Sequence, residues 1–75
     1  MTQANRDAIY ARAIDAETAW TRELKRTFGR DACNARYEKR GQGVPGGALN
    51  AAYVERTAAM AALHDYWESR RLIRA

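Results

Sequence analysis

Glycines in residues 40–47, RGQGVPGG, have the spacing of a phosphate-binding motif. Gly41, Gly43 and Gly46 match G-x-G-x-x-G, which holds a dinucleotide pyrophosphate when it follows a strand and opens a helix. Here an arginine-rich helical stretch precedes the glycines, no β-branched run occurs, and Pro45 lacks an amide hydrogen. We therefore interpret the stretch as a hinge between two helices, with Gly41 as a left-handed terminator and Pro45 near the next start.

Few side chains in the sequence are able to act in catalysis or to bind a metal. Cys33 is the single cysteine and His64 the single histidine, which falls short of a metal-binding set. Nucleophilic catalysis by Cys33 needs a neighbouring base, and His64, beside Asp65, is expected about two helical turns away. Cys33 is interpreted as a small, partly buried filler and His64 as a helix-flank residue. We expect no enzymatic activity, no metal and no cofactor.

Length and composition limit the class of protein. Residues 1–75 make one small domain without an internal disulfide, so regular helix packing or self-association is expected to stabilise it. Charged residues within the first twenty positions argue against a signal peptide or anchor. No run approaches the roughly 20 apolar residues of a membrane span. We expect a cytoplasmic protein with no membrane partner.

Hydrophobic periodicity predicts an all-α fold. Apolar residues recur at steps of three and four along two segments. They predict an antiparallel αα-hairpin of two long helices, residues 4–39 and 48–73, joined by the hinge at residues 40–47. Gly29 interrupts the first helix at a cost of about 1 kcal/mol relative to alanine. The alternative is a break near Gly29 into three helices, with Asp31 capping a separate short helix.

One antiparallel register of these helices pairs apolar residues and opposite charges together. This register leaves several apolar side chains without cover, which a short third helix or, more simply, a four-helix homodimer would bury. The expected pairs are Leu24–Leu63, Trp20–Trp67, Ile14–Ile73, Asp31–Arg56 and Glu17–Arg70. The side chains left without cover are Tyr10, Ile14, Tyr66, Leu72 and Ile73.

Basic residues are concentrated in the middle of the chain. The net charge is +4, and residues 22–40 contain seven Lys and Arg against three acidic residues. At about 100° per residue, most of these cations lie on the arc of the first helix opposite Trp20 and Leu24. Such an arc is either a solvated face or a docking face for phosphate or an acidic protein groove. The candidate partner-binding residues are Arg22, Lys25, Arg26, Arg30, Arg36, Tyr37, Lys39 and Arg40.

The hinge and its flanks carry a resemblance to phage proteins. Residues 35–53, ARYEKRGQGVPGGALNAAY, resemble short phage proteins with an R-Y-x-x-R-G-x-G hinge. The size and the Ala- and Arg-rich composition are similar to those of small helical proteins of phages and prophages in GC-rich bacteria. Proteins of this style include anti-CRISPR proteins, which bind a bacterial surveillance complex and block its target DNA. The resemblance implies an inhibitor in the cytoplasm of a bacterial host cell, and it assigns no role to any residue.

Three functions follow as hypotheses. The leading one is a non-enzymatic binding or inhibitor protein of the phage counter-defence kind. Its partner would be a nucleic-acid-handling protein complex of the host, such as a CRISPR surveillance complex. The alternatives are a small nucleic-acid-binding regulator and a structural dimerisation module. Salt dependence separates the first two, because counterion release makes direct DNA binding weaken steeply with salt.

Overall fold

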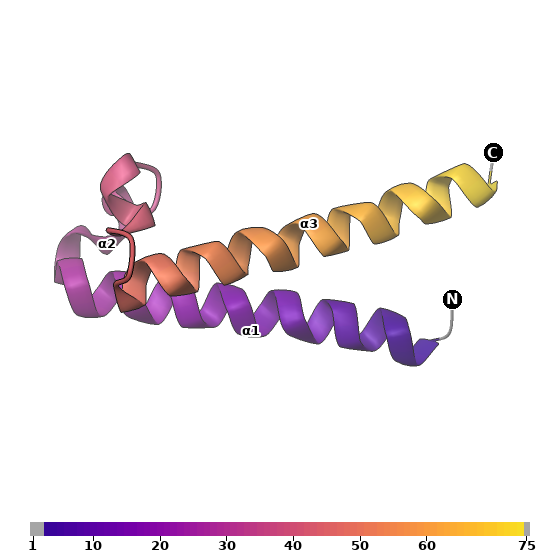
Figure 1. The fold of residues 1–75 in the computed structure, drawn as a ribbon, viewed down its shortest axis with the longest axis horizontal. Helices are drawn as coiled ribbons and strands as arrows, with labels where there is room; N and C mark the ends of the chain where they lie inside the picture. The colour runs from indigo at the N-terminus through magenta and orange to yellow at the C-terminus, as the bar shows by residue number, and fades with distance from the viewer. Residues whose placement is uncertain (1–2, 75) are drawn as a thin grey trace.

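Two long antiparallel helices form the body of the molecule. The computed structural model describes the backbone of residues 3–74 and the side chains of residues 5–71. The helices lie closest where the chain connects them and diverge toward the two termini (Figure 1). No strand occurs in the described backbone, so the predicted all-α helical hairpin is confirmed. The elements are α1 (Gln3–Phe28), the 3₁₀ turn η1 (Gly29–Asp31), α2 (Ala32–Ala35), the 3₁₀ turn η2 (Lys39–Gln42) and α3 (Ala48–Arg74).

The first helix ends at Phe28, and not near residue 39 as the continuous-helix interpretation predicted. Gly29 follows with a φ of 57°, a left-handed conformation that ends helices and favours glycine. The chain then forms η1 and α2, so the three-helix alternative is correct. Asp31 makes no capping hydrogen bond to the backbone of α2. Its carboxylate accepts a hydrogen bond from the Asn34 side chain instead, at 2.8 Å.

The left-handed backbone at Gly29 provides a test of this break. A Cβ at Gly29 would meet no atom within 4 Å, so Gly29→Ala is expected to cost only backbone strain, about 1 kcal/mol of unfolding free energy. Arg30→Ala, at the exposed next position, is expected to change stability by less than about 0.5 kcal/mol. Urea unfolding followed by circular dichroism measures both variants. Equal stability of Gly29→Ala and the wild type would contradict the left-handed conformation.

The register of α1 against α3 differs from the predicted one. Trp20 packs against Tyr53, with ring centroids 5.6 Å apart, and not against Trp67. Glu17 accepts a hydrogen bond from Arg56 at 2.8 Å, and not from Arg70. The predicted register is wrong because it assumed that the first helix continues to residue 39. A helix that ends at Phe28 meets α3 closer to the start of α3.

Two other predicted pairs depend on the same assumption of a continuous first helix. Asp31 pairs with Arg40 in the connecting segment, and not with Arg56. The pair of Ile14 with Ile73 lies outside the described side chains, as does Leu72. On the outer flank of the seam, Arg12 and Glu55 form a bidentate ion pair, with N–O distances of 2.8 and 2.9 Å.

Small side chains bring the two helices together. Alanines occupy several buried positions of the seam, and Leu24, at 1% exposure, is its most buried large side chain. Where the helices diverge, aromatic rings fill the wider space: Tyr10 packs edge-on against Tyr66 and accepts a hydrogen bond from Trp67 Nε1 at 2.6 Å. The buried residues are Ala13, Ala16, Trp20, Leu24, Ala35, Leu49, Ala59, Leu63 and Tyr66. Tyr66 is therefore covered within the hairpin, contrary to expectation.

Neither α1 nor α3, over the residues described, has an apolar stretch long enough to cross a bilayer.

Candidate functional site

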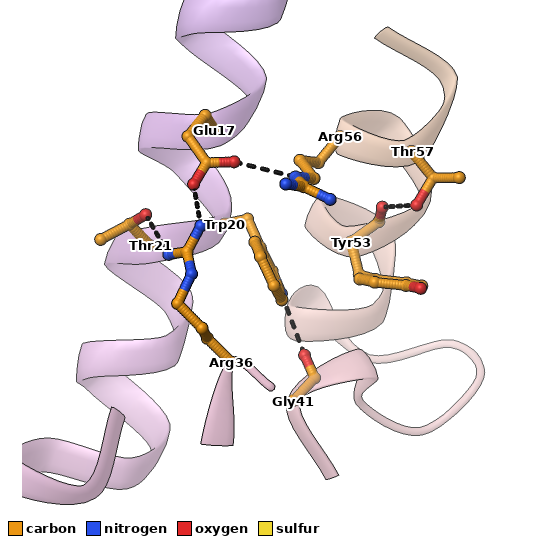
Figure 2. A network of polar contacts seen from close by, with 8 residues as sticks. All are labelled: Glu17, Trp20, Thr21, Arg36, Gly41, Tyr53, Arg56 and Thr57. Carbon is orange, nitrogen blue, oxygen red and sulfur yellow. Dashed lines mark hydrogen bonds and ion pairs between the residues drawn. The ribbon is translucent and has the colours of Figure 1, made fainter. Parts of the chain in front are cut away.

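Trp20 anchors the segment that connects the two long helices. The ring is 3% exposed, and its Nε1 donates a buried hydrogen bond to the Gly41 carbonyl at 2.9 Å. A buried indole N–H needs such an acceptor. The guanidinium carbons of Arg36 and Arg56 lie 4.8 and 5.0 Å from the ring centroid. Figure 2 shows Arg36 from the connecting segment and Arg56 from α3 on either side of Trp20. The connection between the helices is thus fixed to α1 from several directions.

Glu17 joins the two arginines. Its carboxylate accepts hydrogen bonds from Arg56 and from Arg36, whose other terminal nitrogen donates to Thr21 Oγ1 at 3.4 Å (Figure 2). Burial disfavours the charged form of Glu17, but the hydrogen bonds and charges of Arg56 and Arg36 outweigh it, and its pKa lies below the ordinary value of 4.5. Arg36 is therefore held inside the molecule by an acidic partner, which it shares with Arg56.

Two further cations of the predicted docking face also have acidic partners. Arg26 pairs with Glu23 one turn earlier on α1. Arg40 pairs with Asp31 and Glu38, and its guanidinium carbon lies 5.1 Å from the Phe28 ring centroid. Hydrogen bonds from Asn34 and Arg40 lower the pKa of Asp31. The pairs of Arg36 and Arg40 hold the connecting segment, whereas the pair of Arg26 lies within α1, and all three cations already have an acidic partner.

Four predicted cations remain exposed. None of them forms an ion pair with any residue whose side chain the structure describes, and Tyr37 beside them is 84% exposed. We call these five residues the basic apex. The basic apex consists of Arg22, Lys25, Arg30, Tyr37 and Lys39.

The candidate residues line three grooves, of which two involve the connecting segment; the third, of about 370 Å³ on α1, holds Arg22 and Lys25. A groove of about 240 Å³ between α1 and α2 brings Lys25, Arg36 and Tyr37 together. A second groove of about 310 Å³ lies beside the glycine-rich loop and brings Arg26 together with Arg40. The predicted docking face is thus divided: the first groove holds members of the basic apex, and the second holds cations that already have partners.

The residues considered for catalysis are not brought together. Cys33 is exposed on the first groove, whereas the sequence predicted a partly buried filler. His64 is exposed on α3, with Glu68 as its acidic neighbour at 3.9 Å. Over the described side chains, no three His, Cys, Asp or Glu residues gather as a metal site would require.

The glycines of residues 40–47 form the expected hinge in a different way from the one predicted. Gly41 is buried and does not have the left-handed conformation expected of a terminator, whereas Gly43 and Gly46 have φ of 76° and 88°. A Cβ at Gly41 would lie 2.1 Å from the Ala35 carbonyl oxygen, so glycine is required there by close approach of the backbone. The Gly41 carbonyl also accepts the Trp20 hydrogen bond, so this part of the connecting segment contacts both α1 and the end of α2.

Sequence reasoning missed the network of Glu17, Trp20, Arg36 and Arg56. One signal was available: a Trp predicted to lie in a helix seam must find an acceptor for its N–H. Helical carbonyls already accept hydrogen bonds within the helix, so the acceptor is expected in the connecting segment.

Comparisons with protein-family models, with curated proteins and with solved structures found no match.

Proposed function

We propose that this chain is a non-enzymatic binding protein of the phage counter-defence kind. It attaches through the basic apex to an anionic surface of a nucleic-acid-handling complex of the bacterial host, such as a CRISPR surveillance complex. Attachment there blocks the engagement of target DNA. The resemblance to phage proteins supplies the biological setting, and the charge distribution supplies the mode of contact.

The observation that carries the proposal is the unequal pairing of charges. Arg26, Arg36 and Arg40 each pair with an acidic side chain within the fold, whereas the four cations of the basic apex are exposed and form no ion pair with the described side chains. Unpaired cations suit contact with a negatively charged partner, and an exposed aromatic side chain such as Tyr37 is typical of interfaces. A face that only contacts solvent does not require an exposed tyrosine ring.

Charge reversal within the basic apex tests the proposal. Wild-type protein is expected to lower the fraction of target DNA bound by a purified surveillance complex in a gel-shift assay. Arg22→Glu with Arg30→Glu should abolish this effect while leaving the melting temperature nearly unchanged, because both side chains are exposed. The matched control reverses Arg6 and Arg71, which changes the net charge equally outside the basic apex. Equal inhibition by both double variants would contradict the proposal.

A dimerisation role is the second candidate, and one observation favours it. Ile14 is 64% exposed and lies with Tyr10 along a groove of about 440 Å³ on α1. An apolar side chain in this position is suited to a second copy of the hairpin. Sedimentation velocity at tens of micromolar is expected to give a dimer, and Ile14→Asp a helical monomer. A monomeric wild type would exclude this role.

A further inference from the structure

We propose that the groove between α1 and α2 binds single-stranded nucleic acid, with a base stacked on the Tyr37 ring and a phosphate held by Lys25. This inference rests on the proposed function, since it names the chemistry of the anionic partner that the basic apex contacts. The strand would belong to the complex that the protein inhibits, or to the DNA which that complex opens.

The Tyr37 ring is exposed on a segment of backbone that is held in place. It is 84% exposed, while its backbone N–H donates to the Asn34 carbonyl at 3.1 Å in the turn that ends α2. The guanidinium carbon of Arg36 lies 5.9 Å from the Tyr37 centroid, and Arg36 is itself held by Glu17 and by the face of Trp20. A stacking ring on a rigid support loses little conformational entropy when a base is bound.

The groove beside the ring supplies the other half of the site. Lys25 from α1 lines it together with Tyr37 and Arg36, in a volume of about 240 Å³. Lys25 is exposed and has no acidic partner within the described side chains, so it is available to a phosphate. Aromatic rings flanked by cations are the common means by which proteins hold unpaired strands, because every base has a face to stack.

The geometry favours a single strand over a duplex. The faces of bases in a duplex are covered by their neighbours, so an exposed ring finds a base to stack on only where the strand is unpaired. Reading a duplex would need an element able to enter a groove, and Tyr37 lies in the turn after α2, which is only four residues long. An acidic protein would also pair with Lys25 and pack on the Tyr37 ring, so the test below compares strands with and without bases.

Fluorescence anisotropy with two labelled strands of equal length tests the stacking. One strand is oligothymidylate, and the other is abasic at every position and so carries the same phosphates without bases. The wild type should bind oligothymidylate about tenfold more tightly, the effect of one stacked base. Tyr37→Leu should remove this preference without weakening the abasic complex, and Tyr37→Phe should keep it. Because Tyr37 is exposed, a circular-dichroism melt should show both variants folded.

Lys25→Gln tests the phosphate contact. It should weaken binding to both strands by the same factor and reduce the slope of log K against log salt by about 0.7, the value for one phosphate on a single strand. Equal affinity of the wild type for the two strands, or an unchanged preference in Tyr37→Leu, overturns the inference. If Arg22→Glu with Arg30→Glu then still loses inhibition, the proposed function stands and its partner is an acidic protein surface. If that variant also inhibits normally, both proposals fail.

Discussion

Trp20→Ala is expected to lower the unfolding free energy by about 4 kcal/mol, within the range for large buried aromatic residues replaced by alanine. The ring is 3% exposed and contacts Tyr53, and its N–H is the donor that holds Gly41 to α1. A single core in a chain of this size gives about 3–5 kcal/mol of stability. A large fraction of the molecules should therefore be unfolded at 25 °C, which the circular-dichroism signal at 222 nm reports directly.

A pair of Trp→Phe variants separates the packing of the ring from its hydrogen bond. Trp20→Phe keeps an aromatic ring but leaves the buried Gly41 carbonyl without its donor, which is expected to cost about 1–2 kcal/mol. Trp67→Phe removes the corresponding donor to Tyr10 at a site where the indole is 49% exposed. Water replaces the lost partner there, so this control should cost much less. Equal effects of the two variants would mean that the Trp20 contact does not fix the connecting segment.

The existence of both long helices was predictable, because each has a continuous apolar stripe. The start of α3 at Ala48 was also predictable, from the glycines and Pro45 before it. The end of α1 was not. A glycine inside a helix costs about 1 kcal/mol, which tertiary contacts easily outweigh, so the sequence allowed both a break and a continuous helix at Gly29. The contact of Trp20 with Gly41 exists only in the broken form.

The wrong register follows from the break at Gly29, which the sequence alone did not decide. Counting back from the hinge along a continuous helix places Trp20 opposite Trp67, whereas the break places it opposite Tyr53. Both registers offer an aromatic partner to Trp20 and an arginine to Glu17, since the apolar and basic positions of α3 repeat along its length. Local pattern matching could not choose between them, because the choice depends on the length of the connection.

The sequence predicted which residues belong to the candidate site, but not which of its cations have acidic partners and which do not. The exposure of Arg22 and Lys25 follows from their positions on α1 outside its apolar stripe, whereas Arg30, Tyr37 and Lys39 lie beyond the end of that helix. Arg36 was assigned to the same face on the assumption that it continued the first helix. The turn at Gly29 instead redirects it toward Trp20 and Glu17. A residue's face on a helix is defined only as far as the helix extends.

Removing the charge of Glu17 is expected to have the second large effect on the stability of the fold. Glu17→Gln should lower the unfolding free energy at pH 7 by about 2 kcal/mol, because hydrogen bonds to charged groups contribute about 1.5–3 kcal/mol each and glutamine still accepts one. The lower part of that range applies because the side chain is 30% exposed. The variant also leaves Arg36 and Arg56 beside Trp20 without a counter-charge. Glu55→Gln is the matched control, since it breaks an ion pair with Arg12 in which both partners are about half exposed.

The pH dependence of this difference identifies its origin. The pKa of Glu17 in the folded protein lies below its ordinary value of 4.5, so its carboxylate stabilises the fold fully above that pH. As the pH falls through the lowered pKa, Glu17 takes up a proton and the contribution is lost. The gap in stability between the wild type and Glu17→Gln should therefore be constant from pH 7 to about 5 and narrow below about 4.5. Urea midpoints measured between pH 3 and 7 test this, and a gap that stays constant to pH 3 would show that Glu17 contributes through packing and not through its charge.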